Sequence, residues 1–346
     1  MDENELMGSM KVSKAVAKMA IPSVISSLVT VVYNMADTFF VGQTGDPLQV
    51  AAVSQTNPIF ILFMAFANMF GMGGSAAASM ALGEKKEKRV KQVSSFITYA
   101  SLIVGIVFAV ILLVGMQPVL QLFGADADTY ELAKGYTTYI SYGAPFIIWS
   151  AAASFVVRAD GASREAMTGS MIGTVANIIL DPIFISGFGM GAAGAAIATT
   201  IGNIMASVYY LWYFCRKSRN MSMAFRYFKC GDRILSQVCS AGLPTAIFSA
   251  LMSISTIILN QILVAYGNAP VAAIGIVFKA NMFITFLQMG LANGVQPLLG
   301  YSYGAGNRER FIAVERYTKK CCLIVGVLAT ALFFFFREPI IRLFIS

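Results

Sequence analysis

The segment "AKMAIPSVIS" (residues 17–26) recurs in the chain as "CSAGLPTAIFS" (239–249), and this repetition indicates how the protein is built. Its central prolines, Pro22 and Pro244, lie 222 residues apart. Three further pairs repeat at nearly the same offset: "VAAVSQ" (50–55) with "VAAIGI" (271–276), "LGEKKEKRV" (82–90) with "AGNRERFIA" (305–313), and "QPVLQLFG" (117–124) with "EPIIRLFIS" (338–346). Four matches at one spacing indicate two copies of one structural unit.

The composition places these copies in a membrane. Of the 346 residues, 57% are apolar and only 12% are charged, and the mean hydropathy is +0.71. Soluble domains typically carry about twice that charged fraction. The chain has no His, which excludes His-ligated metal catalysis, and its five Cys have no metal-like spacing. We therefore expect an all-α polytopic membrane protein that has no cofactor and is not an enzyme.

Nine apolar runs are long enough to cross the hydrocarbon layer, which takes about 20 helical residues. The predicted spans are 14–40, 49–80, 92–115, 129–157, 165–187, 191–214, 234–265, 270–299 and 312–336. Glycine-rich or charged joints such as "GQTGDP" (42–47) and "GEKKEKRVK" (83–91) separate them.

Lys and Arg are distributed unevenly over the joints. The N-terminus and every second joint carry 21 of the 25 basic residues, whereas Lys134 is the one basic residue in the opposite joints. This positive-inside pattern predicts a cytoplasmic N-terminus and cytoplasmic loops at 83–91 and 216–233. It also explains the net charge of +8 without nucleic-acid binding, which would need a soluble basic domain.

Six spans separate the two copies, so both start on the same side of the membrane. Parallel repeats about an axis along the membrane normal are a transporter architecture. The predicted units are a six-helix bundle at 1–218 and a partial bundle at 219–346 that holds the first three helices of the second repeat. We therefore expect a C-terminally truncated form of a 6 + 6 protein, with an uncovered face on its last three spans.

Charged residues inside the spans are rare and costly, so they are candidate functional residues. They are Asp37, Asp181 and Lys279. One helical turn before Asp37 lies Tyr33, and one turn before Asp181 lies Asn177. If these side chains converge, two carboxylates, an amide and a phenol can hold a proton, Na⁺ or an organic cation. Alternatively, each aspartate only ends a helix near the interface, since Gly42 and Pro182 follow closely.

Other spans offer weaker candidates. Thr199 and Thr200 could add neutral oxygen ligands, although "GAAGAAIATTIG" (191–202) is more typical of a close-packing face. Lys279 could pair with an acid, gate a cavity or reach the interface. Adaptable side chains could line a substrate cavity in the second half, although packing or lipid contact explains each equally well. They are Met252, Met282, Phe283, Phe286, Gln288 and Met289.

Several segments together resemble the multidrug and toxic compound extrusion (MATE) family, in particular its bacterial branch with a cation site in the N-terminal half. They are "MADTFFVG" (35–42), "RADGA" (158–162), "NIILDPI" (177–183), "GIVFKANMF" (275–283) and "GLANGVQPLLGYSYGA" (290–305). The resemblance implies two six-helix bundles around a cleft that opens alternately to each side of the bacterial cytoplasmic membrane. It implies export of amphipathic organic cations in exchange for Na⁺ or H⁺, and a coupling site at Asp37, Asn177, Asp181 and Thr199. Membrane lipids are the other expected partners, and a full-length protein is expected to be monomeric.

Three alternatives remain. An intramembrane aspartyl protease needs Tyr-Asp and Gly-x-Gly-Asp contexts, whereas here the residues are Ala36–Asp37 and Leu180–Asp181. A lipid-linked oligosaccharide flippase would need a cleft rich in Arg and Lys to hold pyrophosphate. A truncated chain could also be a membrane scaffold that transports nothing.

Overall fold

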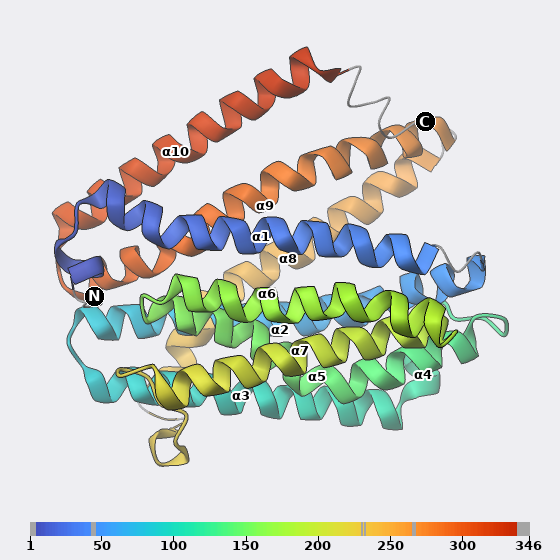
Figure 1. Ribbon diagram of the computed structural model, residues 1–346, viewed down its shortest axis with the longest axis horizontal. Coiled ribbons are helices and arrows are strands. Elements are labelled where there is room, and N and C mark those ends of the chain that lie inside the picture. Colours follow the sequence, from blue (N-terminus) through green and yellow to red (C-terminus); the bar gives the residue numbers. More distant parts are fainter. Residues whose placement is uncertain (1–4, 43–45, 230, 232, 265–267, 338–346) are drawn as a thin grey trace.

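The computed structural model is a bundle of long helices (Figure 1), and it describes all residues except 1–4, 43–45, 230, 232, 265–267 and 338–346. The long helices are α1 (Val12–Gly42), α2 (Pro47–Gly83), α3 (Glu87–Val114), α5 (Tyr130–Ala159), α6 (Ser163–Pro182), α7 (Gly191–Arg216), α8 (Ile234–Val264), α9 (Asn268–Gly304) and α10 (Arg308–Phe335). The short elements are η1 (Glu5–Ser9), α4 (Met116–Leu122), η2 (Ile183–Gly187) and η3 (Phe225–Tyr227).

The nine predicted runs correspond one to one with the nine long helices of the described chain, which confirms the all-α membrane fold. Seven of these helices are long and apolar enough to cross a membrane by length and composition. In α8 the apolar stretch described is the shorter segment Ile234–Phe248, and α9 is not among the seven. The sequence reading did not predict α4, a seven-residue helix after Gly115.

α5 is the centre of the first bundle and packs against α2, α3, α6 and α7. Its buried side chains, among them Ile147, Ile148 and Trp149, contribute to two clusters of the core. α3 approaches α5 closely because Gly105 has no side chain, and a Cβ there would overlap the backbone of Pro145. This crossing fixes the scaffold against which α6 and α7 lie.

The two repeats meet along a seam in which α1 packs on α9 and α2 packs on α8. Contacts across the seam occur in pairs whose members are related by the spacing of the repeat. A Cβ on Gly83 would overlap the carbonyl oxygen of Tyr301, and a Cβ on Gly304 would overlap that of Met80. Gly304 and Tyr301 lie 221 residues after Gly83 and Met80 respectively. The equivalent contacts on both sides of the seam are those expected of a pseudo-two-fold axis between parallel repeats.

The seam is closed at one end of the molecule. This end carries the N-terminal segment and the joints α2–α3, α5–α6, α7–α8 and α9–α10, which gather on the left in Figure 1. All joints that the sequence predicts to be cytoplasmic thus lie together. Near the opposite end, apolar side chains of α1 and α8 are exposed, including Val32, Met35 and Ile258.

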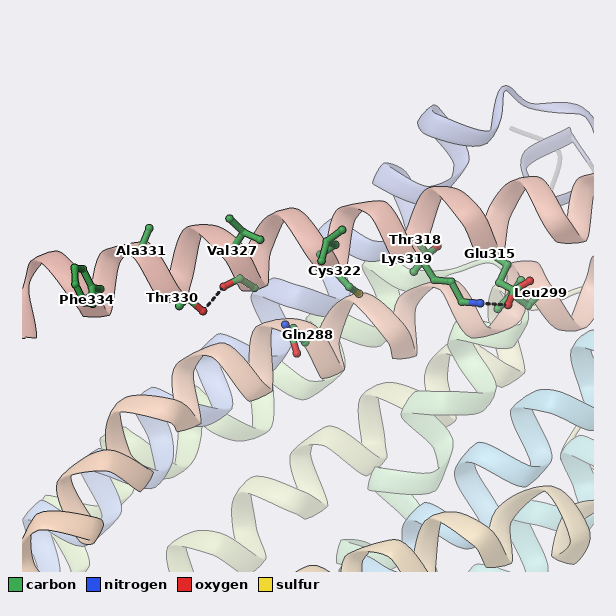
Figure 2. Close-up of a pocket in the computed structure, with 12 residues that line it drawn as sticks. Gln288, Leu299, Glu315, Thr318, Lys319, Cys322, Val327, Thr330, Ala331 and Phe334 are labelled. Atoms are coloured by element: carbon green, nitrogen blue, oxygen red, sulfur yellow. Dashed lines mark hydrogen bonds and ion pairs between the residues drawn. The ribbon is translucent and has the colours of Figure 1, made fainter.

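α10 leans away from the rest of the molecule (Figure 1). A groove of about 980 Å³ lies between α10 and α9, and Figure 2 shows side chains that line it. Val314 is the one buried residue of α10, whereas α3, its counterpart in the first repeat, has eleven. Gly326 is one of the residues that line the groove, and it lies 221 residues after Gly105. At Gly105 the crossing helix α5 fills the space; at Gly326 the nearest atom to an added Cβ is the amide nitrogen of Gln288, 3.6 Å away.

Candidate functional site

The site begins with a close crossing of α6 and α7. Gly173 on α6 and Gly202 on α7 face each other, and a Cβ on Gly202 would lie 2.6 Å from the carbonyl oxygen of Gly173. The same Cβ would lie 3.4 Å from Cβ of Asn177. The small-residue face of α7 is therefore a close-packing face, and it brings a threonine of α7 against the polar side of α6.

A chain of hydrogen bonds crosses this contact. The amide of Asn177 has one orientation that satisfies both neighbours: its nitrogen donates to Oδ2 of Asp181 at 2.9 Å, and its oxygen accepts from Oγ1 of Thr199 at 3.1 Å. In the same orientation the amide oxygen accepts from the backbone N–H of Thr199 at 2.8 Å. The hydroxyl of Tyr33 on α1 lies 3.4 Å from Oγ1 of Thr199. Three helices thus contribute to one polar chain that ends on a carboxylate.

This chain lies inside the bundle. The exposed fraction is 0% for Asp181, 3% for Asn177 and 6% for Thr199. An ionised carboxylate is a pure acceptor, and the donors of the chain can all be directed toward it. Such a buried network is stable only when its members bond one another, water or a cation.

The structure places the remaining predicted residues as follows. Asp37 lies on α1 one helical turn after Tyr33, and Lys279 lies on α9, but both side chains are outside the described residues. Thr200 is turned away from the site and donates to the carbonyl oxygen of Tyr139 at 3.0 Å. Of the two candidate threonines, the structure therefore brings only Thr199 to Asn177.

The proposed substrate residues of the second half do not gather in one enclosed cavity within the described chain. Met252 and Met289 are 55% and 50% exposed, and Phe283 is also exposed. Met282 and Phe286 are partly buried on α9. Gln288 lines the groove between α9 and α10 (Figure 2). Their role in binding substrate stays a prediction.

Sequence reasoning missed two polar residues next to the site. Nδ2 of Asn203 donates to the carbonyl oxygen of Thr199 at 2.8 Å, and Ser150 on α5 donates to Oδ1 of Asn203 at 2.9 Å. They extend the network from α7 to the central helix. Asn203 follows Thr199 by four residues, so the spacing that singled out Asn177 and Asp181 was visible here too.

A second buried carboxylate, Asp160, lies at the turn between α5 and α6. It accepts hydrogen bonds from Tyr213 at 2.8 Å, Ser218 at 2.6 Å and Asn220 at 3.2 Å. Burial raises the pKa of Asp160, while these three hydrogen bonds act in the opposite direction. Asp160 thereby ties the joint after α7 to the first bundle, a role that the motif "RADGA" alone did not reveal.

Gly202→Ala is expected to destabilise the protein by about 1–3 kcal/mol, because the new methyl group must push α6 away from α7. This steric cost exceeds the gain in helix propensity, which is at most about 1 kcal/mol. Thermal unfolding of the detergent-purified protein measures the change. Gly135→Ala is the matched control, since its Cβ would meet only the Cβ of Ala193 at 3.7 Å. Equal melting temperatures for the two variants would show that the crossing is not tightly packed.

Comparisons with known proteins identify the family and the fold of the chain. The MatE family model matches residues 22–183 and 244–346. The multidrug export protein MepA of Staphylococcus saprophyticus is 35% identical over 292 residues, 84% of this chain and 65% of the relative. MepA of Staphylococcus aureus is 32% identical over 317 residues, 92% of this chain and 69% of the relative. The chain thus spans about two thirds of the length of these relatives.

A solved structure has the same fold. The outward-facing conformation of a multidrug resistance MATE family transporter of the MOP superfamily superposes with a TM-score of 0.93 at 26% identity. The superposition covers 99% of this chain and 76% of that chain.

Proposed function

Since the chain belongs to the MatE family, we propose that it is a secondary transporter that exports amphipathic organic cations in exchange for Na⁺ or H⁺. The relatives are named as multidrug export proteins, which supports export of drug-like compounds. Members of this family are transporters and not enzymes. We propose amphipathic organic cations as the substrate class and Na⁺ or H⁺ as the coupling ion.

One observation carries the proposal: Asn177 joins Asp181 and Thr199 inside a membrane-spanning bundle. A carboxylate, an amide and a hydroxyl are oxygen ligands suited to Na⁺, and the carboxylate alone suffices for H⁺. Asp37 follows Tyr33 on the same face of α1, and Tyr33 reaches Thr199. We therefore assign Asp37, Asn177, Asp181 and Thr199 to one coupling site, with Tyr33 in support.

Coupling follows from differential affinity. A cation that enters the site replaces the internal donors of the carboxylates, so it favours the arrangement of α1, α6 and α7 that accommodates it best. A ligand shifts a conformational equilibrium only by the difference between its affinities for the two states. The seam between the repeats, closed at the end with the basic joints, is the element that such a shift would open.

The proposal is tested with the purified 346-residue chain in proteoliposomes loaded with a fluorescent organic cation such as ethidium. An imposed Na⁺ or H⁺ gradient is expected to drive movement of the dye against its own gradient. The ion that gives the effect identifies the coupling ion. Dye movement equal to that in protein-free liposomes under both gradients would contradict the proposal and favour a scaffold role.

The orientation has its own test. We expect Asp128→Cys, in a variant whose native cysteines are replaced by serine, to react with a membrane-impermeant maleimide in intact cells. Asp128 is exposed in the joint between α4 and α5, which the sequence predicts to be extracellular. Reaction only in inverted vesicles would reverse the assigned topology.

The flippase alternative gains no support from the described residues. Among their Lys and Arg side chains, Arg158 is the one that is buried, and its guanidinium lies 5.1 Å from the centre of the Phe155 ring. A pyrophosphate site would need several such cations around one cavity.

A further inference from the structure

The N-terminal segment, residues 5–10, packs into the closed end of the seam. Leu6 and Met7 are 6% and 2% exposed. They share one apolar cluster with residues of α1 and of the second repeat: Ala15, Val16, Met19, Ala20, Val295, Leu298, Tyr301 and Val314. The segment precedes the first repeat in the chain but touches both repeats.

One arginine of the second repeat holds this segment by its backbone. Arg310, in the first turn of α10, donates to the carbonyl oxygens of Met7 at 2.7 Å, Met10 at 2.8 Å and Leu6 at 3.3 Å. Hydrogen bonds from a charged donor are stronger than neutral ones. The contact joins residues about 300 positions apart and bridges the two halves.

The joint between α7 and α8 makes a related contact on the other side of the seam. It precedes the second repeat and lies on α3 of the first: the carbonyl oxygen of Ser222 accepts from Ser94 at 2.9 Å and from Ser95 at 2.7 Å, and that of Met223 accepts from Tyr99 at 3.0 Å. α3 and α10 are counterparts in the repeat. Each repeat is therefore preceded by a segment that crosses the seam to the other repeat.

We propose that the N-terminal segment is a latch that keeps the seam closed at the end with the basic joints, and that Arg310 is the residue that fastens it. Opening the seam at this end separates α1 from α9 and α10. Leu6 and Met7 must then leave the shared cluster, or Arg310 must release the three carbonyl groups. The strength of the latch thereby sets how often the seam opens.

The test measures access to the seam directly. Ser79 is fully buried on α2, with its Cβ 2.8 Å from the position that a Cβ on Gly300 would take. A Ser79→Cys variant without native cysteines is treated with an impermeant maleimide, added in turn to each side of the membrane. Arg310→Ala is expected to raise the labelling rate from the side of the basic joints about tenfold, equivalent to about 1.4 kcal/mol. Arg308→Ala removes an exposed neighbouring charge and is expected to leave the rate unchanged.

A double-variant cycle separates the latch from general loosening. Deletion of residues 2–10, which removes all three carbonyl acceptors of Arg310, is expected to raise the rate as Arg310→Ala does, and combining both changes is expected to add nothing further. Equal labelling of Arg310→Ala and Arg308→Ala, an unchanged rate after the deletion, or additive effects would overturn the proposal. The readout needs no transport, so its outcome is independent of the proposed function.

Discussion

Asp181→Asn is expected to abolish gradient-driven efflux of organic cations and to leave the fold intact. Asparagine has nearly the same shape as aspartate, and its amide oxygen can still accept the hydrogen bond from Asn177. It has no negative charge, so it neither takes up a proton nor balances the charge of Na⁺. Dye efflux in proteoliposomes is expected to fall to the level of protein-free liposomes, while thermal unfolding stays close to that of the parent protein.

Two further variants make this result specific. Asn177→Ala removes a neutral ligand and no charge, so we expect weaker ion binding, with efflux retained at higher ion concentration. Asp128→Asn removes a carboxylate from an exposed joint and is expected to transport like the parent protein. If Asp181→Asn still transports under the gradient, Asp181 only ends a helix and the coupling site lies elsewhere.

Gly83→Val and Gly304→Val are expected to abolish transport by a different route, since no side chain fits at either position while the seam is closed. Overpacking of this kind costs about 1–3 kcal/mol or more where the neighbour is backbone. Because the two contacts are equivalent in the repeat, the two variants are expected to have effects of similar size. Labelling of Ser79→Cys measures the opening of the seam, and dye efflux measures its consequence.

Gly135→Val is the control for added volume on a helix, because its Cβ would make only an ordinary contact with Ala193. Transport by Gly304→Val at the rate of this control would show that closure of the seam is not part of the cycle. A large effect of Gly83→Val with none of Gly304→Val would contradict the pseudo-two-fold relation.

The sequence was sufficient for the membrane fold because both of its signals are local or periodic. Apolar runs of about 20 residues predict spans, and the spacing of 221 residues predicts the repeat. The structure confirms the long helices, with ends that differ from the prediction by a few residues. Helix α3 starts at Glu87, whereas the predicted span starts at 92. Helix α9 ends at Gly304, whereas the predicted span ends at 299. The division at 218/219 into two units stays a prediction.

The candidate site was predictable only in part. Asn177 and Asp181 share a helix face by spacing alone. The choice of Thr199 over Thr200 depended on the crossing at Gly173 and Gly202, since neighbouring residues point about 100° apart on a helix.

The contact between the N-terminal segment and Arg310 could not be predicted from the sequence. Leu6 and Met7 form no periodic pattern, and their contact with Arg310 spans about 300 residues. Contacts of this kind follow from the packing of the two repeats and not from local propensity.

Metal bridging between cysteines at positions 37 and 181 tests whether Asp37 and Asp181 form one cation site. In a variant without native cysteines, the double substitution Asp37→Cys and Asp181→Cys is titrated with Cd²⁺, and protection of the thiols from maleimide reports binding. Thiolates are soft ligands that bind such ions strongly when two can reach the same ion. We expect the double variant to be protected at a Cd²⁺ concentration at least about tenfold lower than either single variant needs, because a second ligand adds more than about 1.4 kcal/mol. Equal Cd²⁺ concentrations for the double and single variants would place the two residues beyond the reach of one ion and contradict a shared coupling site.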